Sequence, residues 1–575
     1  MMLNTIHLVA DEWAIVQGMV GYYRILKHAG IKVQVTDEGI VFNPEHLENF
    51  EHYYFQYFLD KYSIAKRDEH ILRSAFATLK NAYEQDDKNK MLQAKKRIDE
   101  CIKRTAIDKV EKKYEETLAT RELIDTGYQI RNQKTYTEYF SDLIDRYIVY
   151  LYDPEINTKL TLNYVKATVM NSYFGQTSFL NVSNNAKTLE QQKAIFRKDY
   201  IENVQVDLLL QALLQQATSE QEILNYLTDS SHFMASKLKR MFKKMNVQQI
   251  HQYVSSEINK CSFFEDQWAF KQYLDQHFSP LSMSSKALNF YWGGNNDLTI
   301  PISELAKLIL FCAPAGASIA AGKSLFIQRE GRFEQLIQAN NIYEIGRQKD
   351  KPFDEILFDL VVEQQKKAEQ AQDSFLILEY ASDYLAKRTD LQYFHFTPGL
   401  CSFFKSDNHI DSFRRLHYTM RTQLVYSFLN YLDPKAIIHS TLREKLRNGY
   451  TSHDIVYACL LRHEFNILVK GEKSMGVSLE KGKKRIWSAF YAGVEVRNKC
   501  EEGKVRSVAY RLLNAVRAND KKMFLDTTMR LYMSIDSPLP TVFMSVLDES
   551  EIDFPSVANS FIAGFISKKE EQDND

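Results

Sequence analysis

The sequence predicts a mixed, helix-rich α+β protein, with an irregular N-terminal α/β body and an all-α helical bundle at the C-terminus. The chain has 575 residues, which exceeds the capacity of one hydrophobic core and favours roughly two to four domains. Its 45% hydrophobic and 13% aromatic content is typical of folded domains. Periodicity is helical after residue 412, whereas earlier segments alternate helical stretches with short apolar runs.

A domain boundary is predicted near residues 396–412. There Pro398-Gly399 and the polar run from Lys405 to Asn408 interrupt the pattern. The chain is therefore divided into an N-terminal body, residues 1–404, and a C-terminal bundle, residues 405–575.

The clearest helical pattern lies in the bundle. Apolar residues from Val505 to Val516 form one stripe, whereas Arg506 and Arg517 fall mainly on the other side. Helices are expected at residues 504–517, 522–533 and 556–564.

The N-terminal body mixes both kinds of element. Helices are expected from Glu12 to His28, over much of the charged residues 64–150, and over residues 200–280. Strands are expected at residues 31–35, 40–42, 306–312, 325–329 and 374–380. Within residues 64–150, the stretch from Lys88 to Thr120 is rich in Lys and Glu with few bulky apolar residues. This pattern predicts a solvated, charged helical hairpin, which is either a contact surface or a face without a partner.

The distribution of charge and the spacing of the cysteines limit the classes of function that the sequence supports. Net charge is −1, so the chain as a whole is not an electrostatic nucleic-acid binder, but residues 405–510 hold 19 Lys and Arg against 11 Asp and Glu. The six cysteines lie far apart without any Cys-x-x-Cys pair. This predicts reduced, mostly buried thiols in a cytosolic protein, and argues against disulfides and a zinc ribbon. The longest apolar run, residues 308–322, contains Pro314 and is too short to cross a membrane.

Two segments resemble catalytic or metal motifs, but the first has the wrong spacing and the second lacks further ligands. In the segment ending Gly322-Lys323-Ser324, five residues separate the glycines, whereas a phosphate-binding loop needs four, and a strand pattern follows. His453-Asp454 lacks further ligands for a metal, and Thr451-Ser452 before it is expected to cap a helix. We therefore expect no catalytic group, cofactor or metal.

A basic cluster in the bundle suggests contacts with nucleic-acid phosphates, since flexible lysines bind phosphates without reading sequence. Gly471 and Gly482 are expected to keep this segment mobile. The cluster comprises Lys470, Lys473, Lys481, Lys483, Lys484 and Arg485, and Arg506 and Arg517 are added from the next helix. A solvated basic loop is the alternative interpretation.

Two Asn/Gly-rich segments are candidates for reading bases, because amides donate and accept hydrogen bonds in a DNA groove. In the first, the candidates are Gln176, Asn181, Asn184 and Asn185, with Lys187 on a phosphate. The second-choice loop contributes Trp292, Asn295 and Asn296. Ordinary turns explain both segments equally well, since Asn and Gly are common turn residues.

The sequence of the C-terminal helices resembles the C-terminal helical bundle of the large subunit of type I-B CRISPR–Cascade surveillance complexes. The residues that carry this resemblance are AYRLLNAVRANDKKMFLDTTMRLYMSI followed by SVANSFIAGF. The resemblance is clearest over residues 374–575. It extends more weakly to the helix containing Ile15 to Gly21 and to Tyr173-Phe174-Gly175.

The resemblance implies a non-catalytic subunit of a prokaryotic, cytoplasmic ribonucleoprotein. Such a subunit contacts the crRNA 5′ handle, reads the protospacer-adjacent motif on duplex DNA, and helps to separate the strands. Its bundle lies along the displaced single strand, and it helps to recruit a helicase-nuclease. Further implied partners are the Cascade backbone and handle-binding subunits and a small subunit. That small subunit is in several relatives made from an internal start, for which Met420, or else Met475, is the candidate.

Several members of the resembled family carry paired cysteines that suggest a zinc site, and this chain lacks them. Two rival functions stay open. One is a nucleotide-dependent antiviral effector enzyme that uses Gly322-Lys323-Ser324. The other is a helical scaffold that binds only protein, for which the basic excess in residues 405–510 would be accidental.

Overall fold

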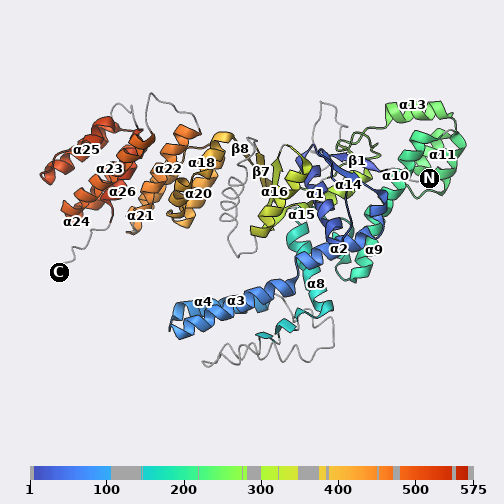
Figure 1. Ribbon diagram of the computed structural model, residues 1–575, viewed down its shortest axis with the longest axis horizontal. Helices are drawn as coiled ribbons and strands as arrows, with labels where there is room; N and C mark the ends of the chain where they lie inside the picture. The colour runs from blue at the N-terminus through green and yellow to red at the C-terminus, as the bar shows by residue number, and fades with distance from the viewer. Residues whose placement is uncertain are drawn as a thin grey trace. The chain divides into compact units, whose positions relative to one another are not determined.

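A computed structural model describes most of the chain. The described residues are 5–104, 144–145, 147–149, 151–217, 219–274, 276–281, 300–320, 323–329, 331–346, 375–383, 388–449, 452–469, 479–546 and 552–567. The structure is helix-rich with small antiparallel sheets, and its C-terminal region is all helical, which confirms the predicted α+β class (Figure 1).

The chain forms two compact units. Unit 1 comprises Met1–Phe326, Gly331–Asn340 and Glu379–Gln392, and unit 2 comprises Ile327–Glu330, Asn341–Leu378 and Tyr393–Asp575. The predicted division into residues 1–404 and 405–575 stays a prediction.

Unit 1 is built around helix α1 (Trp13–His28), which is the helix expected there. Strand β1 (Ile6–Val9) pairs antiparallel with β2 (Gly39–Phe42), with Ile6 opposite Phe42. The strand expected at residues 31–35 is wrong. Only Val35 forms a bridge, to Ile40, because the chain already turns at residues 36–39.

The strand expected at residues 306–312 is also wrong, since this segment is helix α14 (Glu304–Phe311). The hydroxyl of Ser303 accepts a hydrogen bond from the backbone N–H of Ala306 at 3.2 Å and so caps the helix. Every residue of α14 except Lys307 is buried. A helix buried on all sides has no polar face, so its sequence reads as a continuous apolar run, which is equally typical of a buried strand.

Within the charged residues 64–150, α3 (Ile64–Glu84) and α4 (Lys88–Arg104) pack against each other as a helical hairpin (Figure 1). Buried Leu72, Leu79 and Ile98 belong to one hydrophobic cluster there. The hairpin therefore has an apolar seam of its own. The structure describes only the first part of the stretch from Lys88 to Thr120, so the hairpin expected within that stretch stays a prediction. Residues 105–143 of this prediction lie outside the described part of the chain.

The remaining helices of unit 1 surround α1 and α14 or form a smaller helical group. Their bounds are α2 (Phe50–Lys61), α8 (Pro154–Tyr164), α9 (Leu189–Phe196), α10 (Glu202–Gln216), α11 (Glu220–Asp229), α12 (Ala235–Phe242), α13 (Val247–Glu257) and α15 (Ala313–Gly316). The helicity expected over residues 200–280 holds only to Glu257. Beyond it, a loop leads to β3 (Lys271–Gln272), which pairs antiparallel with β4 (Pro301–Ile302).

A four-stranded sheet has the order β5-β6-β7-β8. Its strands are β5 (Ser318–Ala320), β6 (Lys323–Arg329), β7 (Phe375–Asp383) and β8 (Arg388–Phe396), and α16 (Phe333–Gly346) follows β6. The strands expected at residues 325–329 and 374–380 are confirmed, whereas β8 was not expected.

The described part of unit 2 after β8 is helical, as expected. Its α-helices are α18 (Pro398–Lys405), α19 (Asp407–Arg414), α20 (Tyr418–Leu429), α21 (Lys435–Asn448), α22 (Asp454–Leu468), α23 (Leu479–Lys499), α24 (Glu502–Arg517), α25 (Lys521–Ser534) and α26 (Phe554–Phe565). All of α26 except Pro555 is buried, and it packs against α22, α23 and α24. This apolar helix is therefore the centre of the bundle.

Local details bear on three further expectations. Ser452 does not cap α22, because its hydroxyl donates to the backbone oxygen of Ala563 at 2.6 Å, and Thr451 lies outside the described residues. Five cysteines are buried and Cys401 is half-buried, as expected for reduced thiols. No helix among the described residues is long and apolar enough to cross a bilayer.

Candidate nucleic-acid interface

One face of α21 carries a row of basic side chains. Lys435, His439, Arg443 and Arg447 follow one another at intervals of four residues, so they lie on one side of the helix. Like charges at this spacing destabilise a helix by about 0.2–0.5 kcal/mol per pair. Arg443 and Arg447 therefore repel each other, although Arg447 in the last turn also interacts favourably with the helix dipole, and an anionic ligand would relieve the repulsion.

Helix α24 runs antiparallel to α21 along this row. Arg506 donates a hydrogen bond to the backbone oxygen of Arg447 at 3.4 Å, and His439 Nε2 donates to the backbone oxygen of Leu513 at 3.0 Å. The first contact joins the end of α21 to the first half of α24, and the second joins the first half of α21 to the second half of α24. We call the combined surface the basic seam; it comprises Lys435, His439, Arg443, Arg447, Arg506 and Arg517.

A pocket of about 700 Å³ opens on the basic seam. Lys435, Arg443 and Arg517 line it, are exposed, and have no ion-pair partner among the described residues. Asn559, only 2% exposed, also lines the pocket, and its side-chain oxygen has no hydrogen-bond partner among the described residues. This volume lies in the range typical of small-ligand sites. The pocket thus combines unneutralised cations with an unsatisfied amide.

Arg462 of α22 also lines the pocket and is held rigidly. It makes two hydrogen bonds to the carboxylate of Asp433, and its Nη1 donates to Asp553 at 2.6 Å and to Ser556 at 2.8 Å. Burial alone would lower the pKa of Arg462, but Asp553 and Asp433 outweigh it and raise the pKa. Arg462 therefore stays charged and fixes the start of α26, while the exposed seam cations remain available.

The predicted basic cluster is ordered where the structure describes it. Lys481, Lys483, Lys484 and Arg485 all belong to the first turns of α23. Gly482 is buried in this helix, and a Cβ at its position would lie 1.9 Å from His463 Nε2. The expectation that Gly482 keeps this segment mobile is therefore wrong. Lys470, Lys473 and Gly471 lie outside the described residues.

The four described members of this basic cluster differ in their surroundings. Lys481 and Lys484 are exposed, and Arg485 is half-buried. Lys483 pairs with Glu464 at 2.5 Å, and burial lowers the pKa of Lys483. Glu464 is 3% exposed and also contacts His409. Lys483 therefore neutralises a buried carboxylate, which accounts for its presence without a nucleic acid.

The Gln176–Lys187 segment forms two short 3₁₀ turns, Ser178–Leu180 and Val182–Asn184. Asn181 caps the second turn by accepting from the backbone N–H of Ser183 at 3.0 Å. Asn184 donates to the backbone oxygen of Ser178 at 2.8 Å. Two of the predicted amides thus hold the turns together.

The exposed members of the same segment face a basic environment. Gln176, Asn185 and Lys187 are exposed. Lys159 donates to the backbone oxygen of Asn185 at 2.7 Å, and Lys166 donates to its side-chain oxygen at 3.4 Å. Burial, assisted by Lys159, lowers the pKa of Lys166 to about 8. The second-choice residues Trp292, Asn295 and Asn296 lie outside the described residues.

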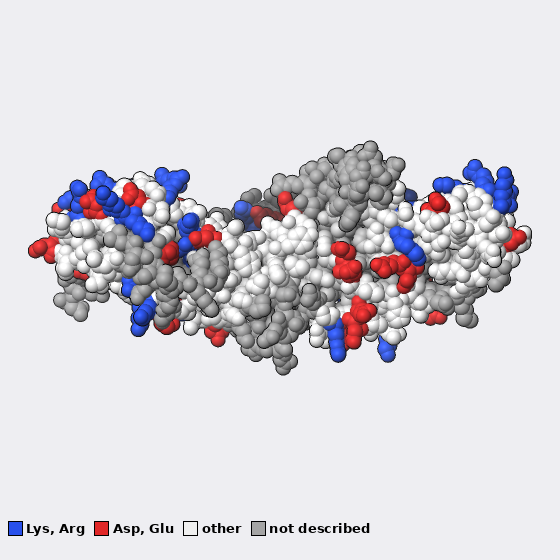
Figure 2. All heavy atoms as spheres, turned by 90° about the horizontal axis from the view of Figure 1, so that it is seen from above, with Lys and Arg blue, Asp and Glu red and all other residues white. Residues whose placement is uncertain are grey.

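A second basic surface, which was not predicted from the sequence, lies on α12 and on the residues directly after it. Figure 2 shows blue side chains gathered over the helices between α11 and α13, at the right of the view. The surface comprises Lys237, Lys239, Arg240, Lys243 and Lys244, and none of these forms an ion pair with another described residue. Residues 230–256 contain no Asp or Glu. A local charge count over this short segment would have found it.

After α13, the chain forms a compact hairpin around Cys261. The backbone N–H of Cys261 donates to Gln267 at 2.8 Å, and the N–H of Gln267 donates to Phe264 at 2.9 Å. Cys261 Sγ accepts from the backbone N–H of Ser303 at 3.4 Å. Phe264, three residues after the cysteine, is 6% exposed. The turn is therefore closed by backbone hydrogen bonds and apolar burial.

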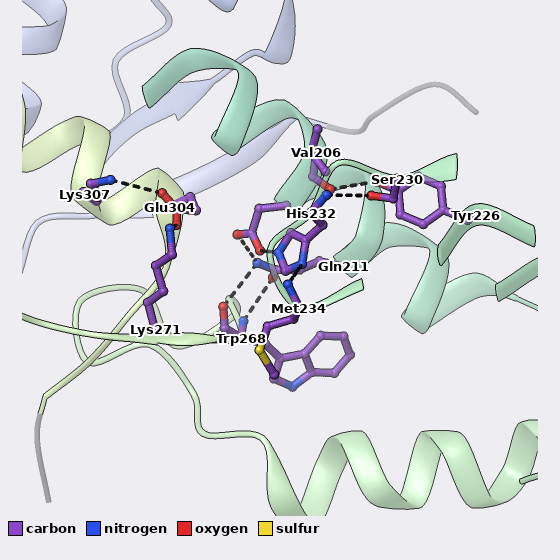
Figure 3. Close-up of polar contacts among 11 residues, drawn as sticks. Val206, Gln211, Tyr226, Ser230, His232, Met234, Trp268, Lys271, Glu304 and Lys307 are labelled. Carbon is purple, nitrogen blue, oxygen red and sulfur yellow. Dashed lines mark hydrogen bonds and ion pairs between the residues drawn. The ribbon is translucent and has the colours of Figure 1, made fainter. Parts of the chain in front are cut away.

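A buried polar network anchors this hairpin to α10 (Figure 3). Gln211 donates to the backbone oxygen of Trp268 at 3.2 Å and accepts from its N–H at 3.0 Å. Asp207 accepts from Gln211 at 2.8 Å and from His232 at 3.2 Å. Burial raises the pKa of Asp207, although His232 opposes the rise.

A second group in the same view ties the next strand to α14 (Figure 3). Glu304 at the start of α14 pairs with Lys271 of β3 at 2.5 Å and with Lys307 at 3.5 Å. Glu304 is 4% exposed, so both cations offset the cost of burying its carboxylate. Together, these contacts hold the described residues near Cys261, Trp268 and Lys271 against α10 and α14.

The other cysteine of this region lies at the far end of α14. Cys312 is fully buried, its thiol donates to the backbone oxygen of Leu308 at 3.3 Å, and burial raises its pKa well above the usual value. Cys261 contacts Ser303, immediately before α14, whereas Cys312 follows its last residue. Nine residues of helical rise separate these points by about 13 Å.

Comparison with known proteins gives one match. Residues 261–318 match the family model described as CRISPR-associated protein (Cas_CXXC_CXXC). No curated protein and no solved structure matches the chain.

The family description names two Cys-x-x-Cys pairs, an arrangement that commonly holds zinc through four thiolates. The residues of this chain do not fit such a group. Phe264 and Ala315 stand three residues after Cys261 and Cys312, and both are buried. The separation of the two cysteines across α14 also prevents them from sharing one ion. The match nevertheless identifies the chain as a CRISPR-associated protein with a Cas_CXXC_CXXC domain in residues 261–318.

Proposed function

We propose that the chain is the non-catalytic large subunit of a type I-B, crRNA-guided Cascade complex in antiviral defence. In this role it recognises the protospacer-adjacent motif on duplex DNA, assists strand opening and R-loop stabilisation, and helps to recruit the helicase-nuclease. Its partners are the crRNA, the target duplex and its displaced single strand, the Cascade backbone and handle-binding subunits, and a small subunit.

The observation that carries this proposal is the basic seam in a chain with a CRISPR-associated domain. Lys435, Arg443 and Arg517 are exposed, unpaired among the described residues, and gathered at one pocket, although the whole chain has a net charge of −1. Figure 2 shows further Lys and Arg over the C-terminal helices, at the left of the view. Such concentrated charge is typical of surfaces that bind phosphates.

The division of labour in a guided complex explains why the charge is local. Guide pairing reads the long target sequence, while the protein needs to read only a short duplex motif and hold backbone phosphates. The α12 surface in unit 1 and the basic seam in unit 2 are suited to phosphate contacts. The exposed Gln176, Asn185 and Lys187 remain our candidates for contact with the duplex motif.

A non-catalytic role is part of the proposal. Among the described residues, no group of three or more His, Cys, Asp and Glu side chains could hold a metal ion. Lys323, which the rival nucleotide-dependent enzyme would need at a phosphate, lies in β6 and pairs with Glu379 at 2.5 Å. A phosphate-binding loop would lead into a helix instead. The position of Lys323 in β6 and its pairing with Glu379 argue against the rival nucleotide-dependent enzyme.

An internal start at Met420 has a structural consequence within this proposal. Met420 is 2% exposed inside α20, so a product beginning there would lack α18 and α19. Phe403 of α18 packs against Phe428 and Phe465, with ring centroids 5.2 and 5.4 Å away. A small subunit starting at Met420 would therefore need a partner to cover this apolar surface. Met475 lies outside the described residues.

The test is DNA binding by the reconstituted complex at several salt concentrations. The triple variant Lys435→Gln, Arg443→Gln, Arg517→Gln should bind every target more weakly. The slope of log affinity against log salt should fall in magnitude by up to about 0.9 for each duplex phosphate that the variant no longer binds. Complex assembly should be unchanged, because these side chains are exposed.

A matched control removes three exposed lysines from the α3–α4 hairpin, namely Lys80, Lys90 and Lys96, each changed to Gln. This control changes net charge by the same amount but leaves the basic seam intact. If the seam variant and the hairpin variant have the same salt dependence as the wild type, the basic seam does not contact DNA. If the chain does not assemble with crRNA and the backbone subunits, the large-subunit role is wrong.

A further inference from the structure

Four aromatic side chains form a row on α22 and α23, which we call the aromatic row. It comprises His453 at the N-cap of α22, Tyr457 one turn further, and Trp487 and Tyr491 on α23. Ring centroids are 5.6 Å apart for Tyr457 and Trp487, and 5.8 Å apart for Trp487 and Tyr491. The last pair is stacked, with 25° between the ring planes.

The outer part of the row is not part of the hydrophobic core. Tyr491 is 61% exposed and His453 is exposed, whereas their neighbour Phe490 is only 3% exposed. Phe490 packs edge-on against Trp487, with ring centroids 6.1 Å apart. The bundle thus uses Phe490 for burial and presents the rings next to it at the surface. Large aromatic faces at a surface are typical of binding sites.

Cations accompany the rings. The guanidinium of Arg415 lies over the Tyr457 ring, 5.2 Å from its centroid, and donates to its hydroxyl at 2.9 Å. Lys481, Lys484, Trp487 and Tyr491 occur at helical intervals of three, three and four residues, so they follow one face of α23. Lys484 is exposed and has no ion-pair partner among the described residues.

We propose that the aromatic row is a stacking site for the bases of a single-stranded polynucleotide, with Arg415, Lys481 and Lys484 contacting its phosphates. Every base has a π face, so aromatic rings bind single strands without sequence preference while cations follow the backbone. In a duplex the base faces are already stacked and unavailable. Tyr, Trp and Arg also occur in protein interfaces, but Lys is depleted there, so two exposed lysines on the same face favour a polynucleotide.

The inference deepens the proposed function, because it names the surface and the interaction that would hold the displaced strand. It is tested on the purified full chain alone, so its outcome does not depend on complex assembly. The probes are an oligothymidylate of about 12 nucleotides, an abasic oligonucleotide of the same length, and a duplex, each carrying a fluorophore. The wild type should prefer the base-bearing strand to the abasic one.

Three variants separate stacking from charge. Tyr491→Ala should lower affinity for oligothymidylate roughly tenfold and leave affinity for the abasic strand unchanged. Tyr491→Phe should retain wild-type affinity, because the ring is kept. Lys484→Gln should weaken both strands equally and reduce the salt slope by about 0.7.

Tyr393→Ala is the matched control, since this tyrosine of β8 is also exposed, at 48%, and lies outside the aromatic row. It should bind all probes as the wild type does. Equal wild-type affinity for base-bearing and abasic strands would overturn the inference. An unchanged affinity of Tyr491→Ala for oligothymidylate would also overturn the inference. If Tyr491→Ala instead released a protein subunit from the assembled complex, the aromatic row would be a protein interface.

Discussion

Gly493 of α23 and Gly564 of α26 lie opposite each other where the two helices cross. A Cβ added to Gly493 would lie 3.0 Å from the carbonyl carbon of Gly564 and 2.2 Å from the backbone oxygen of Phe561. A Cβ added to Gly564 would lie 2.0 Å from the backbone oxygen of Phe490. Backbone atoms cannot move away by a rotamer change, so this crossing requires residues without side chains.

Gly493→Ala should therefore lower the free energy of unfolding of unit 2 by about 1–3 kcal/mol, the usual cost of overpacking a core. The measurement is the midpoint of urea unfolding of the full chain. Gly503→Ala is the control, since Gly503 lies in α24 and an added Cβ would have no neighbour within 4 Å. Alanine there should leave stability unchanged or raise it by up to about 1 kcal/mol. Equal midpoints for the two variants would mean that the helices do not cross this closely.

Lys483 and Lys484 are adjacent but should respond differently to neutralisation. Lys483→Gln leaves buried Glu464 without its cation and should cost about 1–3 kcal/mol of stability. Lys484→Gln should change stability by less than about 0.5 kcal/mol, because Lys484 is exposed. Thermal unfolding of the two single variants provides the comparison. A larger loss for Lys484→Gln would contradict the pairing of Lys483 with Glu464.

His277 should make unit 1 sensitive to acid. Burial, with help from Lys307 and Lys271, lowers the pKa of His277 to about 3. In the unfolded chain its pKa is about 6.5. The unfolded state therefore binds the extra proton first, and this contribution to stability is complete above pH 6.5 and is lost progressively as pH falls toward 3. At pH 5 the loss should be about 2 kcal/mol relative to pH 8.

The variant His277→Gln removes this titration, so the stability difference between pH 8 and pH 5 should shrink by about 2 kcal/mol. Its amide can still accept the hydrogen bond that the backbone N–H of Leu274 donates to His277 Nδ1. Unfolding midpoints of both proteins across this pH range supply the test. Parallel curves for variant and wild type would show that His277 is not buried in its neutral form.

The Gln176–Lys187 segment should divide into structural and DNA-reading residues. Asn185→Ala should cost about 1–3 kcal/mol of binding on a duplex with the correct motif and little on a scrambled motif. Lys187→Ala should weaken both targets equally, because phosphate contacts carry no sequence information. Binding of the assembled complex to matched duplexes measures both effects.

Asn184→Ala is the internal comparison, because its amide holds Ser178 at 2.8 Å. It should weaken both targets equally by loosening the turn. If Asn185→Ala also weakens both targets equally, the segment is structural, and Trp292, Asn295 and Asn296 become the next candidates.

Periodicity predicted the helices with one exposed face, and also the buried helix α26, but it failed for the buried helix α14 and for strand β8. In α24, polar residues interrupt the apolar stripe at regular intervals, so its bounds could be placed closely. Around α14, burial of seven of the eight residues removes that signal, and helix and strand give the same apolar run. Strand β8 carries polar residues such as Asp390 and His395 between its apolar ones, and it lies at the edge of the sheet beside the preceding strand, β7.

The candidate site was predicted only in part, because a charge count does not reveal which charges are already neutralised. Lys483 and Lys484 look alike in sequence, but a residue nineteen positions earlier, Glu464, decides which of them is free. The row on α21 is visible as a four-residue spacing, whereas its alignment with Arg506 and Arg517 depends on how α24 packs. Likewise, Tyr457 and Trp487 meet only because α22 and α23 pack together.

The hairpin at Cys261 has a consequence for how the amount of folded protein in the cell depends on zinc. Where four thiolates hold a zinc ion, folding is linked to the concentration of free metal, and a chelator unfolds the domain. Here backbone hydrogen bonds, Phe264 and the contact between Gln211 and Trp268 close the same stretch of chain. This segment should therefore mature without waiting for metal, and zinc starvation should leave its abundance unaffected.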